Sequence, residues 1–304
     1  MSIKNYKVAA ALAIFCTLLW GTAFPFIKVG YAQFGIEGND IGSKLLFAGA
    51  RFTLAGIMVL FIFLVKNKHL PKIEKNGIMP VMLLGSVQTF GQYIFTYIGI
   101  GFTSGANTSV ITACATFFTV LFAPLFFKSD KLNICKIIGC VLGFCGVLCV
   151  NSGGVTADTL FGDFMILMST LSAAAGNFIS KGIVRDREPI SVTGFQLLFG
   201  GILLLIAGFV TGGKLDFSSI KALLVLLWLA FVSAAAFAIW TALLKHHPAS
   251  RICVFNLLVP VFGTLLSGIM LGESVFGIET IVSVVLICAG IFISNMQIKK
   301  RCER

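Results

Sequence analysis

Two cations lie within or at the end of apolar segments of this chain. Lys28 ends the segment LLWGTAFPFIK at residues 18–28, and Arg51 lies inside the following apolar segment. A charge within a membrane span is costly, so both residues are candidates for binding an anionic group such as a carboxylate. The alternatives are that Arg51 reaches the lipid headgroups and that Lys28 lies at the membrane interface.

Uncharged polar groups within apolar segments form a second set of candidates. Gln88 and Gln92 are four residues apart, so they share one face of a helix, with Tyr93 and Tyr97 on the adjacent stripe. In a membrane such groups need hydrogen-bond partners, either from other helices or from a substrate. The remaining candidates for a substrate path are Trp20, Thr22, Asn107, Thr112, Asn177, Trp240 and Asn256.

The first apolar segment also contains residues that loosen a helix. Gly21 and Pro25 do so because Pro25 leaves a carbonyl one turn earlier without its usual donor. At membrane depth, irregular backbone is tolerated where protein or a watery cavity satisfies it. Together with Trp20 and Thr22, this pattern predicts a cavity wall. The alternative is a kinked packing helix with an interfacial lysine. Pro260 predicts a similar kink later in the chain.

Motifs for chemistry other than binding are missing from the sequence. It contains no H-E-x-x-H pattern, no paired acids within apolar segments, no Walker A loop and no TVGYG filter. His246 and His247 lack further metal ligands nearby. The nine cysteines lie mostly in apolar runs, which is typical of small packing residues. We therefore predict no catalytic residue, no metal and no cofactor, and we expect that the protein is not an enzyme.

Membrane helices must position these side chains. The 304 residues are 58% hydrophobic and 12% charged, whereas soluble domains carry roughly 25% charged residues. The sequence predicts an all-α integral membrane protein. Runs of about 20 apolar residues predict ten transmembrane helices. They lie at 8–29, 45–65, 78–100, 104–127, 134–151, 160–180, 191–210, 220–244, 250–271 and 279–296.

Lysine and arginine indicate the orientation of these spans. Most of the 23 basic residues lie at the two termini and in every second link. The positive-inside rule therefore predicts a multi-pass protein of the cell (cytoplasmic) membrane with both termini in the cytoplasm. The net charge of +11 is thus a topology signal, and we expect no nucleic-acid partner.

The chain also repeats itself. Residues 110–151 align without a gap on residues 254–295, and shorter matches join 17–28 with 170–181 and 50–57 with 195–202. Each unit, 8–151 and 160–296, holds five spans. Since five is odd, the second unit enters the membrane from the opposite side, which gives two inverted five-helix repeats. The motif GCVLG at 139–143 predicts close helix packing. The nearly featureless spans 134–151 and 279–296 predict a peripheral position, and a homodimer through such helices is one arrangement open to the protein.

Several segments resemble the EamA domain of the drug/metabolite transporter superfamily. They are LLWGTAFPFIK, the ARF that opens the second span, and LLVPVFGTLLSGIMLGE followed by GIETIVSVVLICAGIFIS. Two copies of the domain cover nearly the whole chain. The resemblance implies export of small metabolites, such as amino acids. The second copy departs from the pattern, with Ala173 and Ala174 where Trp20 and Gly21 stand in the first.

These observations predict a secondary transporter, an exporter of amino acids or other small polar metabolites. Its expected partners are a small-molecule substrate and the lipid bilayer. The alternatives are a multidrug or cation exporter of the same superfamily, a membrane-embedded enzyme and a channel. A cation exporter commonly needs a carboxylate within the membrane, whereas here Asp163 and Glu279 lie only at span ends. Lys28 and Arg51 favour a substrate with a carboxylate.

Overall fold

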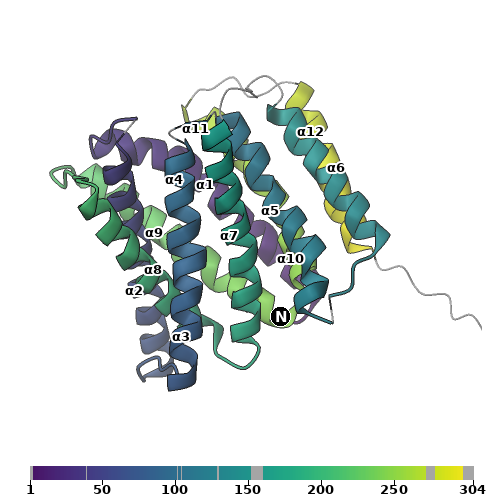
Figure 1. Cartoon of the computed structure of the whole chain (residues 1–304), viewed down its shortest axis with the longest axis horizontal. Helices are drawn as coiled ribbons and strands as arrows, with labels where there is room; N and C mark the ends of the chain where they lie inside the picture. Colours follow the sequence, from purple (N-terminus) through teal and green to yellow (C-terminus); the bar gives the residue numbers. More distant parts are fainter. Residues whose placement is uncertain are drawn as a thin grey trace, which may run out of the picture.

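The computed structural model describes residues 3–38, 40–100, 102–103, 105–128, 130–151, 160–271 and 278–296, and these form helices joined by short links. In chain order the helices are α1 (Tyr6–Gln33), α2 (Ile41–Asn67), α3 (Lys75–Leu84), the π-helical segment η1 (Gly85–Gly91), α4 (Gln92–Ile100), α5 (Gly105–Phe126), α6 (Ile134–Asn151), α7 (Leu160–Val184), α8 (Pro189–Val210), α9 (Ile220–His246), α10 (Ala249–Cys253), the 3₁₀ segment η2 (Val254–Leu257), α11 (Leu258–Leu271) and α12 (Ile278–Asn295). Figure 1 shows them as one bundle.

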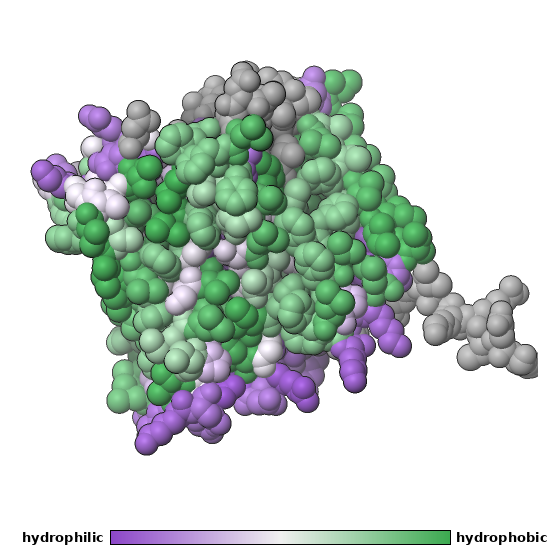
Figure 2. Space-filling view, in the orientation of Figure 1, coloured by the Kyte–Doolittle hydropathy of each residue, from purple (hydrophilic) through white to green (hydrophobic). Residues whose placement is uncertain are grey.

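The bundle has the surface of a membrane protein. Six helical stretches of the described chain are long and apolar enough to cross a bilayer: Tyr6–Gln33, Ile41–Asn67, Lys75–Ile100, Pro189–Val210, Ile220–His246 and Ala249–Met270. Figure 2 shows hydrophobic residues over the middle of the molecule and hydrophilic residues gathered at the end where the N-terminus lies. We call this the basic end, since the N-terminus and the link between α2 and α3, both rich in lysine, lie there (Figure 1). The chain is therefore a multi-pass membrane protein.

Glycines bring two pairs of helices into backbone contact. Between α2 and α8, a Cβ atom added to Gly49 would lie 2.6 Å from the backbone nitrogen of Leu205. Between α6 and α12, one added to Gly139 would overlap the carbonyl oxygen of Gly290. This confirms that GCVLG is a packing motif. Figure 1 shows α6 and α12 side by side at one edge of the bundle, the peripheral position that their sequences indicate.

Two of the predicted spans contain non-α-helical turns. The third has the π-helical segment Gly85–Gly91, which the sequence pattern did not predict. The ninth has the 3₁₀ segment Val254–Leu257, one turn before Pro260. Proline has no N–H for the carbonyl four residues earlier, so the α-helical pattern cannot continue there. The hydroxyl of Thr116 on α5 donates to the carbonyl of Cys253 at 3.2 Å, which satisfies one backbone group beside this turn.

The first two helices are longer than predicted, and this changes where the two cations lie. α1 continues through Pro25 and ends at Gln33, five residues beyond Lys28. α2 begins at Ile41, so Arg51 lies about 15 Å along the helix from its start, whereas the predicted start at residue 45 would place it about 9 Å along. Arg51 is therefore deep in the bundle.

Candidate functional site

Arg51 is a buried cation between α2 and α9. Its side chain is 2% exposed, and its Nε donates a 2.8 Å hydrogen bond to the hydroxyl of Ser233. Ser233 donates in turn to the carbonyl of Leu229 at 2.9 Å. The guanidinium carbon lies 4.9 Å from the centre of the Phe52 ring. Arg51 thus faces the interior, and the alternative in which it reaches the lipid headgroups is wrong.

Three tyrosines interact electrostatically with this guanidinium. Electrostatic interactions join Arg51 to the hydroxyls of Tyr31 on α1 and of Tyr93 and Tyr97 on α4. The hydroxyls of Tyr31 and Tyr97 also interact with each other. Within the described part of the chain, the two terminal nitrogens of Arg51 make no hydrogen bond. A planar guanidinium with free N–H groups can bind a carboxylate through two parallel hydrogen bonds. We call Arg51, Tyr31, Tyr93, Tyr97 and Ser233 the arginine cluster.

An aromatic group lies beside the arginine cluster. The Trp20 ring on α1 packs edge-on against Phe237 and Trp240 of α9, with ring centres 5.5 and 5.0 Å apart. The indole N–H of Trp240 donates to Oδ1 of Asn177 on α7 at 3.2 Å, and both side chains are buried. The ring of Phe237 also packs edge-on against that of Phe52, the neighbour of Arg51, with the ring centres 6.3 Å apart. The structure therefore joins three sequence candidates from distant segments: Trp20, Asn177 and Trp240.

Of the two glutamines of the third span, Gln88 is buried in the bundle and Gln92 is half-buried. Gln88 is 6% exposed and packs on Gly176 of α7, where an added Cβ would lie 2.6 Å from the Cβ of Gln88. The backbone carbonyl of Gln92 accepts a 2.8 Å hydrogen bond from the hydroxyl of Thr96. Thr96 also bonds to Ser169 of α7 at 2.6 Å. The polar stripe of this span thus holds the third helix against α7, beside the aromatic group.

Other candidates lie apart from these clusters. Lys28 and Thr112 are exposed on α1 and α5. Pro25 is buried within α1, and the hydroxyl of Thr22 donates to the carbonyl of Leu19 in the same helix at 2.6 Å. The sequence predicted the same role for Lys28 and Arg51, but Lys28 is exposed whereas Arg51 is buried.

The last two candidates are asparagines. The side chain of Asn107 lies outside the described residues. Asn256 lies in the 3₁₀ turn η2, and its Oδ1 is buried without a hydrogen-bond partner in the described structure. An unpartnered buried amide is costly, so it marks a place where a ligand or another conformation can supply a donor.

Gln196 on α8 is a buried polar residue that sequence reasoning missed. It is 1% exposed, and its Oε1 accepts a 3.1 Å hydrogen bond from the hydroxyl of Thr89 in η1. Its Nε2 has no partner among the described residues. A signal was present, because the alignment of residues 50–57 on 195–202 places Gln196 opposite Arg51.

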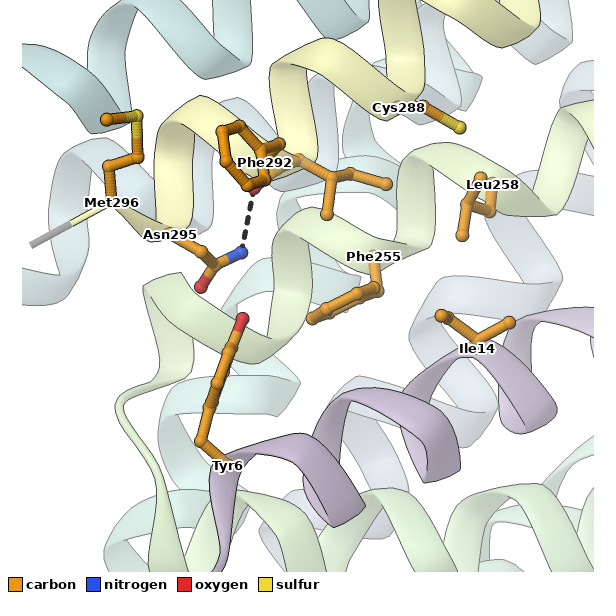
Figure 3. A pocket seen from close by; sticks show the side chains of 9 residues that line it. Tyr6, Ile14, Phe255, Leu258, Cys288, Phe292, Asn295 and Met296 are labelled. Atoms are coloured by element: carbon orange, nitrogen blue, oxygen red, sulfur yellow. Dashed lines mark hydrogen bonds between the residues drawn. The ribbon is translucent and has the colours of Figure 1, made fainter.

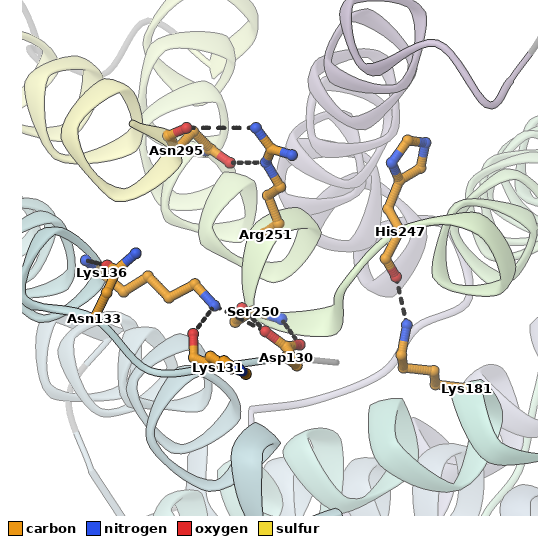
Figure 4. Close-up of polar contacts among 9 residues, drawn as sticks. All are labelled: Asp130, Lys131, Asn133, Lys136, Lys181, His247, Ser250, Arg251 and Asn295. Carbon is orange, nitrogen blue, oxygen red and sulfur yellow. Dashed lines mark hydrogen bonds and ion pairs between the residues drawn. The ribbon is translucent and has the colours of Figure 1, made fainter. Parts of the chain in front are cut away.

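A second missed residue is Asp130, which lies in the α5–α6 link at the basic end (Figure 4). It is fully buried, and its Oδ1 forms an ion pair with Nζ of Lys136 at 2.9 Å. Its Oδ2 accepts a 3.0 Å hydrogen bond from the backbone N–H of Ser250, whose hydroxyl also donates to this carboxylate. Asp130 therefore ties the α5–α6 link to the first turn of α10. Because Asp130 lies in a link, it was not among the acids considered at the span ends.

Lys181 adds a further contact at the same end. It donates to the carbonyl of Leu244 at 3.1 Å and to that of His247. These bonds join the end of α7 to the last turn of α9 and to the link between α9 and α10. Together with the contacts of Asp130, they hold segments that are far apart in the sequence against one another at this end of the bundle.

Replacing Asp130 by asparagine tests this contact. We expect Asp130→Asn to lower the free energy of unfolding by about 1–3 kcal/mol, because the amide keeps the shape but removes the charge facing Lys136. Thermal unfolding of the purified protein in detergent measures the change. Asp216→Asn, at an exposed loop acid, is the matched control and should melt like the wild type. Equal melting of both variants would contradict the structural role of Asp130.

A groove of about 390 Å³ lies on the side of the bundle, between α1, η2 with α11, and α12 (Figure 3). Its lining is mostly apolar and consists of Tyr6, Ile14, Phe255, Leu258, Cys288, Ile291, Phe292, Asn295 and Met296. It is separate from the arginine cluster. Among the described residues, no three His, Cys, Asp or Glu side chains gather as a metal site requires.

Comparison with known proteins identifies the family. The chain is 26% identical over 291 residues to the Bacillus subtilis protein "Uncharacterized transporter YoaV", covering 94% of this chain and 96% of that protein. It is 29% identical over 300 residues to a Salmonella typhimurium "Probable amino-acid metabolite efflux pump", covering 93% of each. It is also 26% identical over 284 residues to the Escherichia coli "Uncharacterized inner membrane transporter YedA", covering 91% of this chain and 87% of that one.

A solved crystal structure has the same fold, with a TM-score of 0.80 at 17% identity over 96% of this chain and 98% of that one. The model of the EamA-like transporter family matches residues 7–152 and again residues 160–296. These two matches cover nearly the whole chain, and the protein therefore belongs to the EamA-like transporter family.

Proposed function

We propose that this protein is a secondary transporter that exports amino acids or other small polar metabolites across the cytoplasmic membrane. The observation that carries this proposal is the buried guanidinium of Arg51, whose terminal nitrogens have no hydrogen-bond partner among the described residues. A buried charge without a counterion is costly, so a ligand that brings a carboxylate is favoured there. The transporter moves its substrate unchanged, so no catalytic residue is part of the proposal.

The aromatic group suits the rest of such a substrate. Trp20, Phe237 and Trp240 offer ring surfaces for an apolar or aromatic body, and Asn177 offers an amide to a polar group. The Salmonella relative, described as a probable amino-acid metabolite efflux pump, supports the same substrate class. A multidrug or cation exporter remains the alternative, and the arginine cluster disfavours it because a cationic substrate would be repelled.

We further propose that the chain forms ten spans as two inverted five-helix units, 8–151 and 160–296. The twofold match of the family model supports this arrangement. Matched contacts support it too: Arg51 bonds to Ser233, and Gln196, which aligns with Arg51, bonds to Thr89, which lies as far before Ser233 as residue 110 lies before residue 254. Gln196 lies 145 residues after Arg51, and Ser233 lies 144 residues after Thr89. An inverted repeat places the substrate path at the interface of the units and lets one rock against the other.

The proposed orientation predicts which end can be labelled from outside the cell. Cysteines introduced as Leu70→Cys and Asp186→Cys lie exposed at the basic end and should be protected in intact cells. Glu37→Cys and Asp216→Cys lie exposed at the opposite end and should react with a membrane-impermeant maleimide. The wild-type chain gives the background from its native cysteines. Labelling of position 70 or 186 in intact cells would contradict the orientation with both termini in the cytoplasm.

Transport by the purified protein tests the function directly. Proteoliposomes are screened for uptake of labelled amino acids, with quaternary ammonium dyes as the cationic comparison. We expect saturable uptake of at least one amino acid and none of the dyes. The reverse result would favour the multidrug alternative, and chemical conversion of a substrate would favour an enzyme.

A further inference from the structure

The groove between α1, α11 and α12 is apolar and lies on the outer side of membrane helices. Several of its lining side chains are exposed, with Ile14, Met296 and Phe292 at 40%, 50% and 70%. From Tyr6 to Ile14 it follows α1 for eight residues, or about 12 Å, most of the roughly 15 Å depth of one leaflet's hydrocarbon. Water would find few hydrogen-bond partners in such a groove. The apolar lining of the groove therefore favours a hydrocarbon chain as its occupant.

The end of the groove at the basic end is polar and positively charged. Figure 3 shows Tyr6 and Asn295 at one end, with Ile14, Leu258 and Cys288 toward the other. The guanidinium carbon of Arg251 lies 4.1 Å from the centre of the Tyr6 ring. Arg251 donates through Nε to Oδ1 of Asn295 at 3.3 Å and through Nη2 to the Asn295 carbonyl at 3.5 Å (Figure 4).

These contacts position Arg251 without neutralising it. Asn295 and Tyr6 are uncharged, and no acid within the described ranges forms an ion pair with Arg251. Asp130, the buried acid of this end, is bound to Lys136 and Ser250. A cation thus lies where an apolar groove meets the membrane surface, which is the arrangement that an anionic lipid matches.

We propose that this groove binds one anionic phospholipid, with an acyl chain along Ile14, Leu258 and Phe292 and the phosphate on Arg251. The lipid comes from the leaflet at the basic end. It contacts α1 from the first family match and α11 and α12 from the second, so it bridges the two units of the chain. The site is independent of the substrate that the arginine cluster binds.

Photocrosslinking tests this site without any transport assay. The full chain, purified in detergent, is mixed with phosphatidylglycerol that carries a diazirine on its acyl chain, irradiated and mapped by peptide mass spectrometry. We expect labelled residues in α1 near Ile14 and in α12 near Phe292, with competition by unlabelled phosphatidylglycerol but much less by phosphatidylcholine. Arg251→Gln should reduce the labelling by phosphatidylglycerol about fivefold, the factor for one basic residue at an anionic surface.

Two matched variants separate the headgroup from the chain. Arg185→Gln removes an exposed arginine at the same end and should leave the labelling unchanged. Ile14→Trp fills the groove and should reduce labelling by phosphatidylglycerol and phosphatidylcholine alike. Labelling that is spread evenly over the outer helices would overturn the site, and so would equal competition by both lipids. Crosslinks between two copies of the chain at these residues would assign the groove to a homodimer instead.

Discussion

Arg51→Gln should slow amino-acid uptake in proteoliposomes by about 10- to 100-fold, the effect of losing a charge-assisted pair worth roughly 1.5–3 kcal/mol. Glutamine can still reach Ser233, but it lacks the charge and the planar fork that bind a carboxylate. Arg51→Lys keeps the charge and loses only the fork, so its rate should lie between those of wild type and Arg51→Gln. This order distinguishes binding of a carboxylate from a purely structural role.

Lys28→Gln is the matched control, because Lys28 is exposed on α1 whereas Arg51 is buried. Its uptake rate should stay within about twofold of wild type. Each variant is first melted in detergent, so that slow uptake is interpreted only for folded protein. If folded Arg51→Gln carries amino acids at the wild-type rate, Arg51 does not bind the substrate carboxylate. If the wild type moves quaternary ammonium dyes instead, the proposed substrate class is wrong.

The helical fold class could be predicted because burial in lipid dominates the sequence. A span needs about 20 apolar residues, and this requirement predicts the second helix at 45–65 where the structure has Ile41–Asn67. Polar residues inside such runs stand out for the same reason. Trp20, Asn177 and Trp240 were found this way, and the structure brings them into one group.

Asp130 and the π-helical turn could not be predicted, for two different reasons. Asp130 lies among lysines in a link, and such residues are usually solvated; its partner Ser250 is 120 residues away in the chain. The turn Gly85–Gly91 keeps a helical pattern of polar and apolar residues, which fits an α-helix as well as a wider π turn. Both features depend on tertiary contacts that no local pattern records.

The close contact of α2 and α8 had a signal that sequence reasoning overlooked. Glycines recur every seven residues in both helices, at Gly42, Gly49 and Gly56 and at Gly194, Gly201 and Gly208. A period of seven keeps small residues on one side of a helix. In the structure four of these glycines face the backbone of the partner helix: added Cβ atoms on Gly56 and Gly201 would each lie 2.5 Å from a backbone nitrogen of the other helix, and those on Gly49 and Gly208 would each lie 2.6 Å from one.

Gly49→Leu should therefore prevent normal folding or lower the free energy of unfolding by at least about 3 kcal/mol, at or beyond the upper end for overpacked cores. The first added atom would meet the backbone nitrogen of Leu205 at 2.6 Å, and backbone cannot move aside as a flexible side chain can. The helices would have to separate, which would break the packing along the whole glycine seam. Size-exclusion profiles and thermal unfolding in detergent measure the loss.

Gly182→Leu is the control for helix propensity and added apolar surface, because a Cβ added there meets no atom within 4 Å apart from its chain neighbours and its own turn of helix. This variant should melt at or slightly above the wild-type temperature, since glycine inside a helix costs roughly 0.5–1 kcal/mol relative to alanine. Gly201→Leu should destabilise the fold as Gly49→Leu does, because its added Cβ would lie 2.5 Å from the backbone nitrogen of Thr53 on α2. If Gly49→Leu elutes and melts like Gly182→Leu, α2 and α8 do not touch through their glycines. Contacts other than those between α2 and α8 would then have to hold Arg51 in the interior.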